Sequence, residues 1–121
     1  MSHFWYALDK ETGEVTTFNT SEDYACYLAS IGGDSSAEFR KSRRIGMEEL
    51  GDFTVSTVFL GIDHRSDRSV GEPILFETMV FRNGAEYAGF TQRYCSLAAA
   101  EQGHKETFMA VKAMWEARVK K

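Results

Sequence analysis

The chain has 121 residues, of which 43% are apolar and 26% are charged, and its formal net charge is −4. This length and apolar content predict one domain, residues 1–121, with one core, and they exclude a disordered chain or a charged tail. The weakly acidic balance disfavours nucleic acid as a partner, and we expect the one basic run, Arg40–Arg44, to be a solvated strand edge.

The first predicted elements are a β-hairpin and a short helix. Aromatic and β-branched residues at 3–8 and 15–18 flank a turn-forming segment, which is typical of a strand, a turn and a second strand. Thr20 or Ser21 can cap the helix that follows, because two acidic residues come next. The helix should end at Gly32-Gly33.

Four more strands are predicted from runs of β-branched, aromatic and aliphatic residues. They run from Phe39 through Met47 and then over residues 53–62, 74–81 and 89–94. Asn83-Gly84 is typical of a tight hairpin turn. Because both faces of strand 74–81 carry large apolar residues, we expect a sheet that is covered on both faces.

Ser96 is placed to cap a C-terminal helix, whose apolar residues recur at helical spacing. The residues on this face are Leu97, Ala100, His104, Phe108, Val111 and Trp115. The face should pack on the sheet. The predicted fold class is therefore α+β, an antiparallel β-meander sheet of about four to six strands packed against a C-terminal helix and a short helix in the N-terminal half.

The two cysteines and the ends of the chain indicate an intracellular protein. Cys26 and Cys95 lack metal-ligand spacing, so we expect two buried free thiols. The first residues have neither a basic segment nor a long apolar segment, and no apolar run has membrane-spanning length. We therefore expect no membrane association and a location in the cytoplasm.

Four polar residues stand at apolar or strand-end positions and are the candidate site residues. Asp63 and His64 follow the predicted strand 53–62, Glu77 lies inside the next strand, and His104 lies on the apolar face of the last helix. Each has a structural alternative. Glu77 can face solvent, His104 can be a hydrogen-bonded core residue, and the strand-end pair can simply mark where the chain leaves the sheet.

If register and helix packing bring His64, Glu77 and His104 together, they form a cluster of two histidines and one carboxylate. Such a cluster could hold a divalent metal or perform acid–base chemistry near neutral pH, with Asp63 orienting a histidine. No cofactor is predicted, and a divalent metal stays open as an alternative. The usual signatures of nucleotide, hydrolase and zinc-peptidase sites are missing, which favours a protein that is not an enzyme.

Several segments together resemble a family of small proteins common in bacteriophage genomes. They are Thr54–His64 (TVSTVFLGIDH), Pro73–Phe81 (PILFETMVF), Arg93–Cys95 and Gly103-His104. This chain departs from the family pattern in its loop 65–72, which is not glycine-rich, and at Cys95, where the family has serine or threonine. The resemblance implies a phage or prophage origin and action in the cytoplasm of a bacterial host. It also groups Asp63, His64, Glu77 and His104, and it implies no substrate.

Three hypotheses follow. The first is a phage accessory protein that acts as a non-enzymatic binding module, with a host or phage protein as partner and inhibition of a host defence protein as one version. A small ligand and a homodimer through an edge strand stay open within it. The second is a small metal-dependent or acid–base enzyme that uses the His/Glu/His cluster. In the third, the polar residues tie the helix to the sheet through buried hydrogen bonds.

Overall fold

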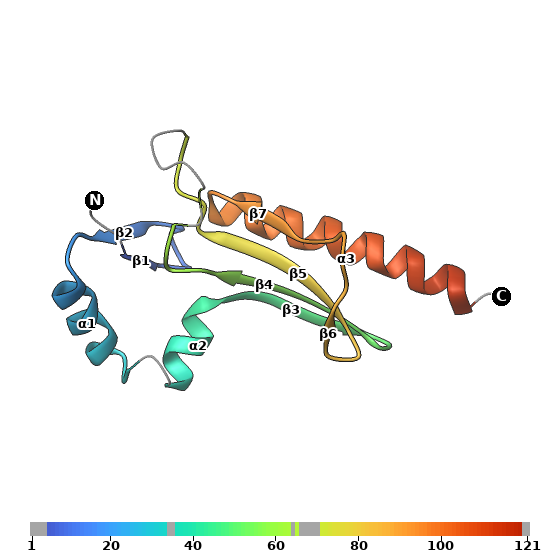
Figure 1. Cartoon of the computed structure of the whole chain (residues 1–121), viewed down its shortest axis with the longest axis horizontal. Coiled ribbons are helices and arrows are strands. Elements are labelled where there is room, and N and C mark those ends of the chain that lie inside the picture. Colours follow the sequence, from blue (N-terminus) through green and yellow to red (C-terminus); the bar gives the residue numbers. More distant parts are fainter. Residues whose placement is uncertain (1–4, 34–35, 64, 66–70, 120–121) are drawn as a thin grey trace.

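In this computed structural model the described residues are 5–33, 36–63, 65 and 71–119, and they form a five-stranded sheet, a two-stranded hairpin and three helices (Figure 1). The strands of both sheets pair antiparallel, and the C-terminal helix packs against the larger sheet. The predicted α+β class is thus confirmed.

The strands of the larger sheet pair with their neighbours in the chain, except for the last strand. Its strands are β3 (Arg44–Leu50), β4 (Phe53–Phe59), β5 (Phe76–Arg82), β6 (Ala85–Glu86) and β7 (Gln92–Tyr94). The order is β3-β4-β5-β6, and β7 also pairs with β5. Asn83 and Gly84 have φ values of 52° and 83°, the left-handed conformations that a two-residue hairpin turn requires, so the predicted turn is confirmed.

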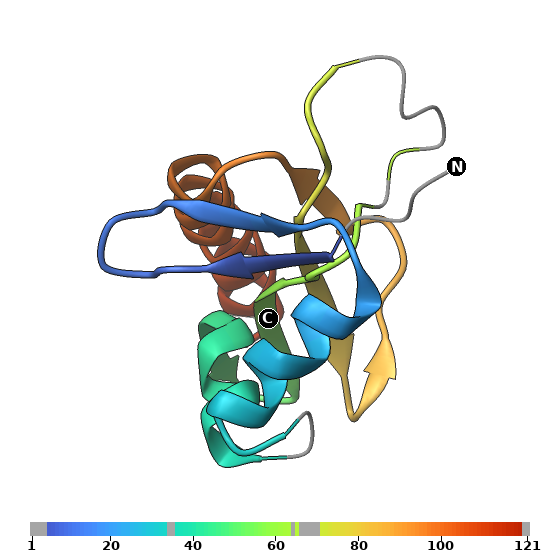
Figure 2. The same ribbon diagram turned by 90° about the vertical axis from the view of Figure 1, so that its left-hand side faces the viewer.

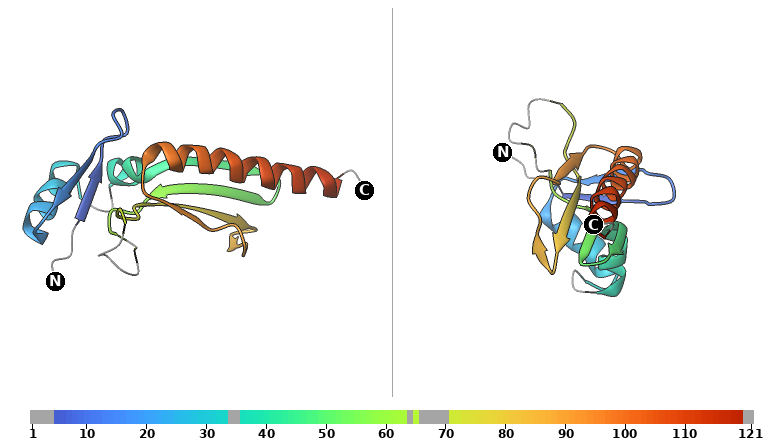
Figure 3. Two further views of the ribbon diagram at one scale, coloured as in Figure 1. Left: turned by 90° about the horizontal axis from the view of Figure 1, so that it is seen from above. Right: turned by 90° about the vertical axis from the view of Figure 1, so that its right-hand side faces the viewer.

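Helix α3 (Leu97–Val119) covers one face of this sheet along its length (Figure 3). It begins as predicted, since Ser96 Oγ accepts a hydrogen bond from the backbone N–H of Ala99. Alternate residues of β4 and β5 are buried beneath it, because strand side chains point to the two faces in turn. The predicted apolar face of α3 supplies Ala100 and Val111, both fully buried.

The interface between α3 and the sheet contains two apolar clusters with polar residues between them. One cluster includes Phe59, Phe76 and Ala100, and the other includes Phe53, Val55, Val80 and Val111. On β4, β5 and α3 the residues between the clusters are Thr57, Thr78 and His104, and all three are buried. This polar layer lies in the middle of the core.

No helix in the described part of the chain packs across the opposite face of the sheet, which we call the open face. It carries Met47, Glu49, Thr54, Ser56, Val58, Glu77, Met79 and Phe81. The expectation of a sheet covered on both faces was therefore wrong. Apolar and small polar side chains alternate across the open face, and those of β4 and β5 are only partly exposed because neighbouring strands shield them.

The hairpin β1 (Trp5–Leu8) and β2 (Val15–Phe18) lies with α1 (Ser21–Ser30) at one end of the large sheet (Figure 2). An antiparallel bridge between Trp5 and Ile62 joins it there, and the 2.9 Å hydrogen bond from Tyr6 N–H to the Gly61 carbonyl is part of that bridge. The predicted hairpin and helix are confirmed, including the cap, in which Thr20 accepts from Asp23 N–H.

A second helix, α2 (Ala37–Arg43), stands where the sequence predicted the start of a strand at Phe39. Ser36 caps it by accepting from Phe39 N–H, and its last turn is basic, which suits the negative end of the helix dipole. Most of the basic run therefore lies at the end of a helix, and only Arg44 lies on a strand edge, as the first residue of β3. Arg43 Nε donates to the Phe59 carbonyl at 2.9 Å and ties this helix to the end of β4.

Both cysteines are free, as predicted, but both are exposed rather than buried. Cys26 lies on α1, which packs on the hairpin through its aromatic residues Tyr24 and Tyr27 and leaves its other side open. Cys95 follows β7 at an edge of the sheet, where its thiol lies 3.6 Å from the Glu72 carbonyl. Among the described helices, none combines the length and the apolar character needed to cross a membrane.

Candidate functional site

The polar layer between α3 and the sheet is a continuous chain of hydrogen bonds. Thr57 and Thr78 face each other on β4 and β5, with 2.5 Å between their hydroxyl oxygens. The Thr57 hydroxyl is 2.7 Å from Nδ1 of His104, and Nε2 of the same ring is 3.0 Å from Oε1 of Glu48 on β3. Four residues from four elements are therefore linked across the core.

The directions of these bonds follow from the chemistry of the groups. A carboxylate can only accept, so we assign a hydrogen on Nε2 that is donated to Glu48. In the neutral ring Nδ1 then accepts from the Thr57 hydroxyl, which in turn accepts from Thr78. Every polar atom of the layer thus has a partner, as a buried polar network requires.

Glu48 is the member of this chain that sequence reasoning missed. Its side chain is 47% exposed, whereas that of His104 is 7% exposed, so the chain leads from solvent into the core. Gly46 was the available signal, since a glycine inside a strand often marks a close approach. A β-carbon there would lie 2.8 Å from His104 Nε2, so only glycine lets the ring sit this close to β3.

Glu48, His104 and Thr57 stand in the order carboxylate, imidazole, hydroxyl, which is the order found in hydrolase triads. Burial argues against catalysis by this set. A nucleophile must reach a substrate, but Thr57 has no exposed surface and its hydroxyl is shared with Thr78. The arrangement instead fits the structural alternative for His104, a hydrogen-bonded core residue that ties α3 to three strands.

Glu77 lies on the open face, away from His104. It is directly opposite Arg93 of β7, and the Arg93 guanidinium donates to it at 2.9 Å. The sheet separates Glu77 from His104 because Thr78, the next residue of β5, points to the helix side. A cluster that contains both residues is therefore ruled out by register, and no group of three metal-binding side chains occurs within the described residues. His64 lies outside them.

Asp63 belongs to a separate loop anchor. Its carboxylate accepts from the backbone N–H groups of Arg65 and Ile74, each at 3.0 Å, and it pairs with the Arg65 guanidinium at 2.7 Å. Burial opposes the charged form and raises the pKa of this carboxyl, but the hydrogen bonds from Arg65 and Ile74 together outweigh it, and the net pKa is lowered. The anchor joins the two ends of the β4–β5 connection and does not contact His104.

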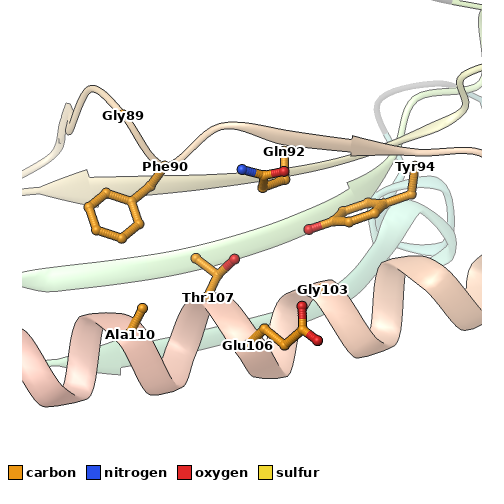
Figure 4. Close-up of a pocket in the computed structure, with 8 residues that line it drawn as sticks. All are labelled: Gly89, Phe90, Gln92, Tyr94, Gly103, Glu106, Thr107 and Ala110. Carbon is orange, nitrogen blue, oxygen red and sulfur yellow. The ribbon is translucent and has the colours of Figure 1, made fainter.

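A shallow groove of about 380 Å³ runs between α3 and the segment that leads into β7 (Figure 4). Phe90, Gln92 and Tyr94 point toward the helix from one side, and Glu106 and Thr107 supply polar groups from the other (Figure 4). Its size and mixed apolar and polar lining could admit a small molecule. The small-ligand alternative rests on this groove.

No protein family, curated protein or solved structure matches the chain. The resemblance to phage proteins consequently stays a prediction from the sequence pattern, and function must be argued from the surfaces themselves.

Replacing Tyr94 by phenylalanine should raise the free energy of unfolding by about 1 kcal/mol, because a buried polar atom without a partner is destabilising. The Tyr94 hydroxyl is buried against Gly103 and has no hydrogen-bond partner among the described residues. Urea denaturation of wild type and Tyr94→Phe measures this. Gly103→Ala is the matched control and should destabilise, since its β-carbon would overlap the Tyr94 ring. A clear loss of stability in Tyr94→Phe would show that the hydroxyl is satisfied.

Proposed function

We propose that the chain is a small phage-type accessory protein that acts as a non-enzymatic binding module in the bacterial cytoplasm, and that it engages a host or phage protein through the open face. Inhibition of a host defence protein is the version that the phage-like sequence pattern favours. The observation that carries the proposal is the open face itself, a sheet surface with apolar side chains and no helix over it in the described part of the chain.

The register places the apolar side chains of the open face in adjacent rows. Met47, Ser56 and Met79 lie side by side on β3, β4 and β5, and Phe81 lies in the next row, opposite Thr54. Methionine side chains are flexible and polarisable, so a surface built around them can adapt to the shape of a partner. Small polar residues separate these apolar side chains, and Glu49, Glu77 and Arg93 add charge around them. A mixed surface of this kind can bind a protein partner.

The enzyme alternative has less support from the described residues. His104 has partners at both ring nitrogens, Glu77 pairs with Arg93, and Asp63 pairs with Arg65. Each of these three groups has a structural role that accounts for its position. On the open face, in contrast, no described helix packs over the apolar side chains of Met47, Met79 and Phe81.

Met79→Glu should weaken partner binding at least tenfold, because burying an unpaired carboxylate in an interface costs more than the about 1.4 kcal/mol that a factor of ten represents. Met109→Glu is the matched control, since Met109 is a 59% exposed methionine on α3, outside the open face. The tagged wild type and both variants are used to capture partners from bacterial lysate, and the affinity for the recovered protein is then measured with purified components.

The proposal predicts a partner that Met109→Glu retains and Met79→Glu loses, while both variants keep the circular dichroism spectrum of the wild type. Equal retention by the two variants would place binding on another surface. Equal loss would show that the methionines affect folding or solubility rather than recognition.

A further inference from the structure

Strand β3 forms one edge of the sheet, and within the described residues it pairs only with β4. Leu50 and Phe53 flank the two-residue turn between these strands, so they form a hydrogen-bonded pair, and every second residue of β3 points its backbone groups the other way. Met47 and Glu49 therefore direct their N–H and C=O groups outward. Such an edge is a template for pairing with another strand.

The start of this edge is closed by a side chain. The Lys10 ammonium, in the hairpin turn, donates to the carbonyls of Lys41 and Arg44 at 2.7 and 3.1 Å. The backbone of β3 is consequently available from Ile45 to Leu50. A second strand could therefore pair with β3 only between these two residues.

The side chains of β3 on the open face are self-complementary in charge. Met47 is opposite Ser56 and Glu49 is opposite Thr54, and a register shift between Arg44 and Gly46 puts Arg44 opposite Val58. All three therefore lie on the open face, in the order basic, apolar, acidic. Arg44 and Glu49 are exposed, and neither has an ion pair in the described part of the chain. A second copy that runs antiparallel presents the same series reversed.

We propose that two copies of the chain form a symmetric dimer by pairing their β3 edges antiparallel, with Met47 of one copy opposite Met47 of the other. In this register the two Met47 residues exchange both backbone hydrogen bonds, and Glu49 of each copy lies next to Arg44 of the partner on the open face. An isologous contact of this kind closes on itself and stops at two copies.

A shifted register can also pair the outward N–H and C=O groups of the two β3 strands with each other, but it is less favourable. It sets Met47 opposite Glu49 and brings the two Glu48 side chains directly opposite each other, and like charges in that position are destabilising. Repulsion between the two Glu48 side chains therefore disfavours the shifted register, and the contact of Arg44 with Glu49 favours the register centred on Met47. The product is one continuous sheet whose α3 helices lie on the same side and whose open faces adjoin.

The test exploits this charge order. Arg44→Glu and Glu49→Arg each place like charges together at both ends of the contact, so each variant alone should dimerise about tenfold more weakly or worse. An equimolar mixture of the two should form a heterodimer, because one variant is acidic where the other is basic. The double variant Arg44→Glu/Glu49→Arg should again form a homodimer. Sedimentation velocity and native mass spectrometry measure the oligomeric state of the two single variants, their mixture and the double variant.

A single strand edge buries less area than a standard interface, so we expect a wild-type dissociation constant on the order of 10 µM. Met47→Pro is the second probe. Proline removes an N–H that points away from β4, so the monomer should keep its fold while the dimer is lost. If that variant fails to fold, the decision rests on the charge variants, which alter exposed side chains only.

A wild-type chain that stays monomeric at about 1 mM would overturn the proposal. So would a dimer that persists in both single charge variants or in a folded Met47→Pro, and so would two monomeric charge variants that do not dimerise when mixed. This dimer goes beyond the proposed function and is separable from it. A monomeric wild type that still loses its partner through Met79→Glu would overturn the dimer alone.

Discussion

Replacing His104 by leucine should lower the free energy of unfolding by about 3 kcal/mol, the largest effect we expect from a single change in the core. The ring is buried and bonded at both nitrogens, and its loss leaves the Thr57 hydroxyl with Thr78 as its remaining partner in the layer. Leucine has a similar volume, so the loss of polar partners dominates over any cavity. Urea denaturation measures the change.

Coupling between the members of the layer gives a sharper version of this experiment. Thr57→Val alone should cost about 2 kcal/mol, because it leaves Nδ1 of His104 buried without a partner. The double variant with His104→Leu should cost less than the sum of the two single changes, since residues in one hydrogen-bond network are not additive. Lys105→Ala, at the exposed neighbouring position, should be close to neutral. Strictly additive losses would contradict a connected network.

Much of the fold could be predicted because it depends on local periodicity. The apolar stripe of α3, the cap at Ser96 and the turn at Asn83-Gly84 are each encoded within a few residues, and each is confirmed. The strand expected from Phe39 through Met47 was right from Arg44 onward, and its first half was wrong for a local reason too. Ser36 caps a helix there, and the apolar residue that suggested a strand serves α2 instead.

The candidate site was harder to predict from the sequence because it depends on contacts between residues that are far apart in the chain. Glu48 and His104 are 56 residues apart, and nothing in the local pattern of β3 pairs one with the other. The side on which Glu77 lies follows from the register of β4, β5 and β7, and a shift of one residue would have moved it under α3. Of the four candidate residues only His104 belongs to the polar layer, because strand pairing places Glu77 on the other face and Asp63 in the loop anchor.

The same dependence on pairing explains why the open face was unexpected. Met79 and Phe81 give β5 a second apolar side, which predicts a covering layer when one strand is considered alone. Across the sheet, however, they alternate with Ser56 and Thr54, so the face is mixed rather than continuously apolar. A mixed face of this kind can remain in contact with water and still bind a partner.

Asp63→Asn should lower the free energy of unfolding at neutral pH by about 3 kcal/mol, because it replaces the carboxylate of a buried ion pair with an uncharged amide. Asparagine keeps an oxygen that can accept from the backbone N–H groups of Arg65 and Ile74, so the loop geometry should survive. The loss should therefore come mainly from the guanidinium, which would face an amide N–H₂ in place of a carboxylate oxygen.

The pH dependence of this effect has a definite sign. The pKa of Asp63 is lowered in the folded chain, so its contribution is fully present above the ordinary carboxyl pKa of about 4 and is lost as the pH falls through the lower, folded value. The difference in stability between wild type and Asp63→Asn should be constant from about pH 7 to pH 5 and should shrink below about pH 4. Asp52→Asn is the control, since Asp52 pairs with Arg82 where both side chains are about one-third exposed, and its effect should be small at every pH. Urea denaturation of the wild type and both variants at a series of pH values measures these differences. If the loss of stability in Asp63→Asn stayed unchanged below about pH 4, the ion pair would not be what stabilises this loop.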